Sequence, residues 1–135
     1  MRRIDTAKLW SLNYRLLMTV ITSVADEIAA LGLDIKELFV LAAIEESRHP
    51  AQLAQTLCMP RPTVTVYLKR LEREGFVRRQ IDPDDLRRHR LSITAAGSRV
   101  LVRGQGLLSE AFGARVSRLT AAEQAQLAAL LEKLS

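Results

Sequence analysis

Apolar residues recur at three- and four-residue spacing between Ala7 and Leu31, a pattern that predicts a long amphipathic helix. A second apolar stripe runs beside the first, so the apolar arc is wider than a helix needs to cover one side of its own domain. We interpret this width as contact with a second surface such as another subunit, with burial inside a monomer as the alternative. The two stripes are Leu9, Leu12, Leu16, Val20, Val24 and Ile28, and Trp10, Tyr14, Leu17 and Ile21.

The segment after this helix predicts a second, shorter helix. Gly32 is suited to end the first one, because glycine readily adopts the left-handed conformation at a helix C-terminus. Asp34 and Glu37 have the spacing of a capping box, so the second helix is expected to run from there to about Glu46. Its expected buried side consists of Leu38, Leu41, Ala42 and Ile44.

Two further helices are predicted, each with a proline in its first turn. Pro50 opens a short helix over residues 51–57 and Pro62 opens the next, because the first turn of a helix does not use the missing N–H. Gly75 ends the second of them. Their expected buried residues are Leu53, Ala54 and Leu57, and Val64, Leu68 and Leu71.

A charged β-hairpin follows these helices. Residues 76–81 and 90–94 have β-like composition, and the second segment alternates apolar with polar residues. The turn between them begins at Asp82 with the sequence DPDD and is rich in arginine. Two short helices, a tight turn and a hairpin are the plan of a winged helix-turn-helix.

Two helices complete the predicted fold. Thr94 is suited to cap the first, whose interior is weakened because each helical glycine costs about 1 kcal/mol relative to alanine. Thr120 and Glu123 form a capping box for the last helix. The glycines are Gly97, Gly104, Gly106 and Gly113, and the apolar face of the last helix is Leu127, Leu130, Leu131 and Leu134.

Positive charge is concentrated in the predicted fourth helix and hairpin. Between Arg61 and Arg90 there are nine Lys and Arg residues against five Asp and Glu residues, so most of the net charge of +5 lies in this segment of a 135-residue chain. The pI of about 10.0 favours a polyanionic partner, either nucleic acid or an acidic membrane surface. The sequence has no apolar run of roughly 18 residues, no signal-peptide core at its N-terminus, and a single cysteine. These features predict a helix-rich cytoplasmic protein.

The outward residues of the fourth helix and the hairpin are candidate DNA contacts. In a winged helix-turn-helix the start of the second helix reaches base edges in the major groove, while the hairpin reaches phosphates or the minor groove. The candidates are Arg61, Thr63 and Thr65 for bases, Lys69, Arg70 and Arg73 for phosphates, and Arg87, Arg88 and Arg90 on the hairpin.

The sequence resembles the MarR family of bacterial transcriptional regulators over nearly its whole length. The resemblance is carried by residues 61–65 and 68–75 in the fourth helix, by Asp85, Leu86 and Arg87 in the hairpin, and by Ile93, Thr94 and Gly97 after it. It implies that Arg87 enters the minor groove and that Asp85 holds it by a salt bridge. It also implies a homodimer on double-stranded DNA, with residues 5–31 and 95–135 as dimerisation helices.

Four features depart from the family pattern. Pro60 replaces the usual serine, so the side-chain cap of the fourth helix is lost, and Val66 replaces a residue that is often arginine. Arg88 replaces the usual small residue after the wing arginine. The segment SRHPAQ, residues 47–52, is shorter than is typical, which predicts a vestigial first strand in the wing sheet.

Other interpretations stay open at three places. Trp10 and Tyr14 either line a crevice for a small-molecule effector or belong to the dimer core, where apolar stripes more often lie. Cys58 is either a thiol sensor or a small buried hydrophobe. The domain could also be a protein-interaction adaptor, for which Val66 beside Tyr67 is the only hint.

No motif for metal, cofactor or catalysis is present in the sequence. His49 and His89 have no partner at metal-ligand spacing, and no nucleophile–base set or phosphate loop occurs. We therefore expect neither a cofactor nor an enzyme. The expected fold is a single MarR-like domain over residues 1–135, mainly α with a small β-hairpin wing, whose DNA-binding region spans 34–94. The favoured function is a ligand-responsive homodimeric repressor that binds a pseudo-palindromic operator.

Overall fold

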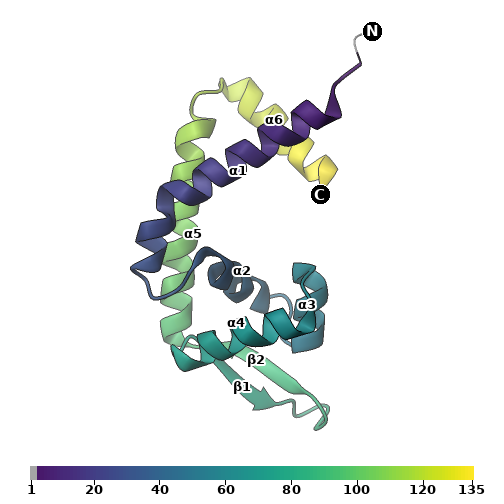
Figure 1. The fold of residues 1–135 in the computed structure, drawn as a ribbon, viewed down its shortest axis with the longest axis vertical. Coiled ribbons are helices and arrows are strands. Elements are labelled where there is room, and N and C mark those ends of the chain that lie inside the picture. Colours follow the sequence, from purple (N-terminus) through teal and green to yellow (C-terminus); the bar gives the residue numbers. More distant parts are fainter. Residues whose placement is uncertain (1–2) are drawn as a thin grey trace. The chain divides into compact units, whose positions relative to one another are not determined.

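The computed structural model describes residues 3–135, and Figure 1 shows the helices and the two-stranded hairpin of that part of the chain. These helices and strands confirm the expected fold class, mainly helical with a β-hairpin wing. Among these residues no helix is long and apolar enough to cross a membrane. The helices are α1 (Thr6–Ala29), α2 (Ile35–Ile44), α3 (Pro50–Leu57), α4 (Arg61–Arg73), α5 (Ala95–Val116) and α6 (Ala121–Leu134), and the strands are β1 (Val77–Ile81) and β2 (His89–Ile93).

The chain divides into two compact units. One consists of Met1–Val24 with Gly106–Ser135 and contains most of α1, the second half of α5 and all of α6. The other, Ala25–Gln105, contains the three short helices, the hairpin, the end of α1 and the start of α5. The narrower DNA-binding region expected from the sequence, residues 34–94, lies within the second unit, and its exact limits stay a prediction.

A shared apolar core holds the second unit together. Helices α2, α3 and α4 pack on one another, α2 and α3 also contact β2, and α4 contacts β1. Burial of each large apolar side chain in such a core contributes about 1.5–3 kcal/mol. The predicted inward stripes are largely confirmed, although Ala42 and Leu57 are only half-buried. The most deeply buried side chains are Ile28, Leu38, Val40, Leu41, Ile44, Leu53, Val64, Leu68, Leu71, Leu91 and Leu101.

Three of the helices begin at caps that the sequence predicts. The Asp34 carboxylate accepts a hydrogen bond from the Glu37 N–H at 2.8 Å and so makes its half of the expected capping box. The Thr94 hydroxyl accepts from the Gly97 N–H at 3.0 Å. At the start of α6, Thr120 and Glu123 form the complete reciprocal box. Each such cap is worth about 1 kcal/mol because it satisfies a backbone donor that the helix leaves unpaired.

The turn between α3 and α4 places Cys58 differently from the sequence-based interpretation. Cys58 ends α3 in the left-handed conformation, with φ 52° and ψ 39°, and its side chain is exposed rather than buried. The interpretation as a buried hydrophobe was therefore wrong, because the left-handed turn carries this residue out of the apolar stripe. Pro60 then precedes α4 without a side-chain cap, as expected, and its carbonyl accepts from the N–H groups of Thr63 and Val64.

The wing is an antiparallel hairpin in which Val77 pairs with Ile93 and Ile81 pairs with His89. On the edge of β2 that does not pair with β1, the Leu91 N–H donates to the carbonyl of Arg48 at 2.6 Å. The sheet of the described residues has two strands, so the expected first strand is reduced to this backbone contact. The shortened segment before α3 explains the reduction, because few residues are available there to extend along β2.

Two glycines of α5 allow close approach to the rest of the second unit. A Cβ on Gly97 would overlap the carbonyl oxygen of Phe76, and a Cβ on Gly104 would lie 2.7 Å from Leu38 Cδ1. Gly106 has open space around it. The helical glycines therefore differ in the space around them. Gly97 and Gly104 are needed where α5 contacts Phe76 and Leu38, whereas Gly106 is not.

Many large apolar side chains of the other unit are exposed. Trp10 is 65% exposed, Leu12 48% and Leu130 58%, and α6 has no buried residue. Such a face is unusual for a protein that acts as a monomer. The further exposed members are Leu9, Tyr14, Leu16, Leu17, Met18, Leu131 and Leu134.

Candidate nucleic-acid interface

The predicted contact residues of α4 lie on its exposed side. Arg61, Thr63, Thr65, Lys69, Arg70 and Arg73 are exposed, whereas the stripe between them forms part of the core. The Thr65 hydroxyl donates to the carbonyl of Arg61 at 2.9 Å. Its oxygen can still accept a hydrogen bond and its methyl group remains available for apolar contact, the two chemistries by which threonine reads a base edge.

A basic depression of about 250 Å³ lies between the start of α4 and the wing. It brings together four members of the predicted set, namely Arg61, Thr65, Arg87 and Arg88. Arg79 adds a further guanidinium to its lining, beside Pro50, Val64 and His89. Guanidinium groups bind phosphate oxygens in a forked geometry, so this depression is suited to a phosphate. A duplex that received α4 in one groove and the wing in the next would pass its backbone here.

Arg70 and Arg73 lie in a different setting. They line a separate depression of about 230 Å³ together with Gly32, Glu37 and Glu74. Burial raises the pKa of the Glu37 carboxyl above its ordinary value of 4.5, the Asp34 carboxylate adds to the rise, and the charge of Arg70 opposes it. Carboxyl groups thus share this depression with the two arginines, which makes it less attractive to phosphate. Thr63, Lys69 and Arg90 line neither depression.

At the wing tip, Asp85 contacts Arg87 in two ways. Its Oδ1 accepts the backbone N–H of Arg87 at 3.0 Å and lies 3.4 Å from the Arg87 Nε. The Arg87 side chain is nevertheless 93% exposed. The carboxylate therefore orients the base of an arginine whose side chain is otherwise exposed, and such an arginine is suited to a narrow minor groove.

A polar cluster beneath the wing was missed by the sequence reasoning. The side chain of Asp82 is 4% exposed, and its carboxylate accepts from the Asp84 N–H at 2.9 Å and from Arg88 Nε at 3.1 Å. His49 Nε2 lies 3.4 Å from the same carboxylate. The Asp84 N–H, together with Arg88 and His49, holds the pKa of Asp82 below its ordinary value of 3.8, although burial acts in the opposite direction. The DPDD turn could have indicated the Asp84 contact, but no local spacing connects His49 to it.

A second contact that the sequence did not indicate joins the wing to α4. Arg79 of β1 donates through Nε to Glu72 of α4 at 2.8 Å. Both side chains are about 30% exposed, so the pair is screened by water and acts mainly as a geometric link.

Arg70 lies with its guanidinium 5.9 Å from the ring centre of Tyr67 on the same helix. Within residues 3–135 no cluster of His, Cys, Asp and Glu is suited to a metal ion.

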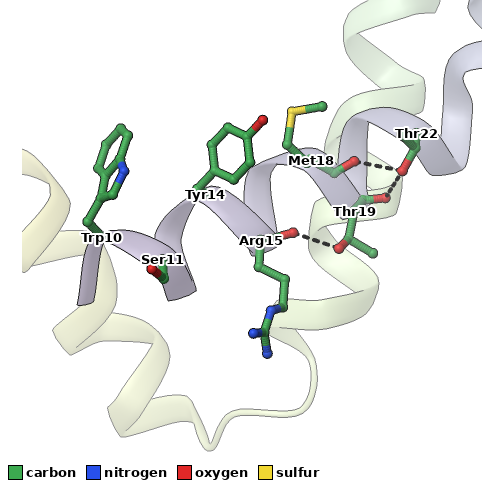
Figure 2. Close-up of a pocket in the computed structure, with 7 residues that line it drawn as sticks. All are labelled: Trp10, Ser11, Tyr14, Arg15, Met18, Thr19 and Thr22. Atoms are coloured by element: carbon green, nitrogen blue, oxygen red, sulfur yellow. Dashed lines mark hydrogen bonds between the residues drawn. The ribbon is translucent and has the colours of Figure 1, made fainter. Parts of the chain in front are cut away.

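Trp10 and Tyr14, the candidate ligand-binding residues, lie one turn apart on α1. Figure 2 shows their rings on the same side of the helix. The ring centroids are 6.4 Å apart. They line a depression of about 470 Å³ with Ser11, Arg15, Met18, Thr19 and Thr22, all from α1. A single helix cannot enclose a ligand, so this surface needs a second wall before it can exclude water from a bound molecule.

Comparison with known sequences relates this geometry to a protein family. The sequence model of the MarR family matches residues 34–89. The homoprotocatechuate degradative operon repressor of Escherichia coli is 36% identical over 81 residues, which cover 60% of this chain and 55% of that protein. The chain thus spans about half the length of that relative. The HTH-type transcriptional repressor Rv2887 of Mycobacterium tuberculosis is 28% identical over 132 residues, which cover 96% of this chain and 95% of that protein.

Comparison with solved structures gives the same relationship. A crystal structure of a MarR mutant from Escherichia coli complexed with operator DNA matches with a TM-score of 0.73 and 25% identity. The match covers 94% of this chain and 93% of that one. The likeness therefore includes the helices at both ends of the chain as well as the winged helix-turn-helix.

Proposed function

The chain belongs to the MarR family, and from this membership we propose that it is a sequence-specific DNA-binding transcriptional repressor. The observation that carries the proposal is the basic depression in which Arg61, Arg87 and Arg88 meet between α4 and the wing. Base contacts would come from Arg61, Thr63 and Thr65 at the start of α4. Phosphate contacts would come from Lys69 and Arg88, and the wing tip would place Arg87 in the minor groove.

We propose a second copy of this chain as the partner of the exposed apolar face on α1 and α6. The side chains of Leu12, Leu17 and Leu130 are each about half exposed, and burying them against an identical face would remove them from water. A two-fold dimer presents two copies of α4. It therefore requires a pseudo-palindromic operator whose half-sites lie about one helical turn, roughly 10 base pairs, apart.

Repression would follow from occupying the promoter, and a small-molecule effector would relieve it by favouring a dimer with wrongly spaced α4 helices. The exposed surface around Trp10 and Tyr14 is the proposed place for such an effector, with its second wall supplied on dimerisation. A regulator of this kind acts in the cytoplasm, where its DNA is.

The test of this function is a titration of the protein against duplexes from its own upstream region and against a shuffled duplex of equal composition. The measurement is repeated between about 50 and 200 mM salt, because phosphate contacts weaken steeply over that range. Tight binding that persists at the higher salt only on the native duplex is expected. Equal binding to both duplexes that disappears with salt would reduce the interface to a basic surface.

Absence of binding even at low salt would favour the alternative function, a protein-interaction adaptor. The observation behind this alternative is Val66, which is 50% exposed on α4 beside Tyr67. Capture of a protein partner that is lost in a Val66→Lys variant would then be the result to look for.

A further inference from the structure

The ring of His49 lies between two hydrogen-bond acceptors of the wing. His49 is the residue before α3, and its Nδ1 is 3.0 Å from the backbone carbonyl oxygen of His89. Its Nε2 is 3.4 Å from a carboxylate oxygen of Asp82. The imidazole is 23% exposed, so this is a partly sheltered bridge from the helix-turn-helix to β2 and to the residue that follows β1.

Both contacts require a donor from the ring. A neutral imidazole has one N–H and one lone pair, whereas an imidazolium donates from both nitrogens. Because a carbonyl and a carboxylate are both acceptors, the doubly protonated ring matches both partners at once. A neutral ring that donates to His89 would turn a lone pair toward the carboxylate of Asp82.

The carboxylate that His49 contacts also orders the wing tip. Asp82 accepts from the Asp84 N–H and from Arg88 Nε, and its own N–H donates to the Arg88 carbonyl at 3.0 Å. Arg87, a residue of the basic depression whose side chain is 93% exposed, lies between these contacts in the chain. The bridge through His49 thus connects the start of α3 with the segment that carries Arg87 and Arg88.

Charged groups surround the bridge. The carboxylate of Asp82 contacts the ring, and Arg88 contacts the same carboxylate. Arg61, Arg79 and Arg87 line the adjoining depression, and Arg48 precedes His49 in the chain. A phosphate bound in this depression would therefore contact the wing segment that His49 positions.

We infer that His49 is a positioning residue of the DNA-binding surface, which ties the wing to the start of α3 more firmly when its ring carries both protons. The inference rests on the proposed function and deepens it, since it makes operator affinity depend on pH. Affinity is expected to fall as pH rises and the ring loses its second donor.

The test removes the other histidine first. The chain has two histidines, so in a His89→Gln variant the remaining ring is that of His49, and the substitution keeps the backbone carbonyl that His49 contacts. Affinity for the native duplex is measured at constant ionic strength in this variant and in the double variant His49→Gln/His89→Gln. The single variant should lose affinity at least about fivefold between about pH 6 and pH 8. The double variant should be weaker at the lower pH and nearly flat, and equal slopes in both would overturn the inference.

A readout without DNA separates this inference from the proposed function. In the His89→Gln variant, ¹⁵N spectra of the imidazole report the titration of His49, and the amide signals of Asp84 and Arg88 report the wing. These amides should shift with the same midpoint as the ring in the single variant and lose that shift in the double variant. If the amide signals of the wing do not shift with the titration of the ring, the inference is wrong even if operator binding is normal. Wing signals that follow the ring while operator affinity stays constant with pH would overturn the positioning role.

If the unsubstituted protein binds no duplex at any pH, the proposed function fails. The tie between His49 and the wing is then decided by the amide signals alone. Thermal unfolding of all variants at a pH where the ring is neutral shows whether a lost signal reflects a lost fold.

Discussion

Asp85 Oδ1 lies 3.0 Å from the backbone nitrogen of Arg87 and 3.4 Å from its Nε, although the arginine side chain is 93% exposed. An isolated ion pair as exposed as this one contributes little to stability. Its value is geometric, because it restricts the direction of a long side chain before any partner arrives. A prepositioned arginine loses less conformational freedom on binding than a free one.

Arg87→Ala is therefore expected to weaken operator binding strongly, by about tenfold or more, with little change in stability. If Arg87 meets a phosphate, the slope of log affinity against log salt should decrease by about one contact. Fluorescence anisotropy at several salt concentrations measures both quantities. Arg118→Ala is the matched control, because it removes the same charge at an exposed position in the other unit. Equal affinity of the Arg87→Ala variant and the unsubstituted protein would remove the wing from the interface.

Thr65 should influence which sequence is bound more than how tightly DNA is bound. Its exposed position near the start of α4 suits contact with a base edge, and a threonine carries no charge to meet a phosphate. Thr65→Ala should change the preferred bases at one position of each half-site by about 1–3 kcal/mol and leave the salt slope unchanged. Selection from a randomised operator library measures the preference. A uniform loss across all sequences would argue against base reading.

The elements of the fold could be predicted from the sequence because their signals are local. The buried residues Val64, Leu68 and Leu71 repeat at helical spacing. Thr120 and Glu123, only three residues apart, predict the start of α6. The overall plan then followed from the order of elements. The boundaries shifted by one or two residues at several ends, because the end of a helix depends on contacts as well as on propensity.

The arrangement of the candidate site could be predicted only in part. The sequence indicated which residues of α4 and the wing would be exposed, but it gave no sign that Arg61 and Arg87 share a depression while Arg70 and Arg73 line another. The contact of His49 with Asp82 joins segments far apart in the chain and has no local signature. The exposure of Cys58 depends on a left-handed backbone that a non-glycine residue rarely adopts.

The glycines of α5 provide a stability test with an internal contrast. Gly97→Ala should lower the free energy of unfolding by about 2 kcal/mol or more, because its Cβ would collide with the backbone of Phe76, which cannot move aside easily. Gly106→Ala has open space and should raise it by up to about 1 kcal/mol through helix propensity. Urea unfolding at a fixed protein concentration measures both. Equal effects of the two substitutions would contradict the close approach at Gly97.

The proposed dimer predicts that charge on the exposed apolar face of α1 or α6 disrupts assembly. Leu17→Glu and Leu130→Glu should each raise the dimer dissociation constant by more than about 100-fold, since a carboxylate buried without a partner is strongly unfavourable. Sedimentation equilibrium measures the change. Leu17→Met, which keeps the site apolar, should leave the dissociation constant nearly unchanged. Monomeric behaviour of the unsubstituted protein at all concentrations would exclude the dimer itself.

The lowered pKa of Asp82 predicts a defined loss of stability in acid. A carboxyl whose pKa is lower in the folded than in the unfolded protein stabilises the fold at pH values above its ordinary value of 3.8. This contribution disappears as pH falls through that value toward the lower pKa of the folded state. Asp82→Asn should therefore be less stable than the unsubstituted protein at neutral pH, and the difference should shrink below about pH 4.

Thermal unfolding between about pH 2.5 and pH 7 measures this difference directly. Asp84→Asn is the control, because it removes an exposed carboxyl from the same turn while keeping the backbone N–H that donates to Asp82. Its difference from the unsubstituted protein should be small throughout this range. A stability gap for Asp82→Asn that stays constant down to the lowest pH would mean that the charge of Asp82 contributes nothing, and that the side chain acts through its shape and neutral hydrogen bonding alone.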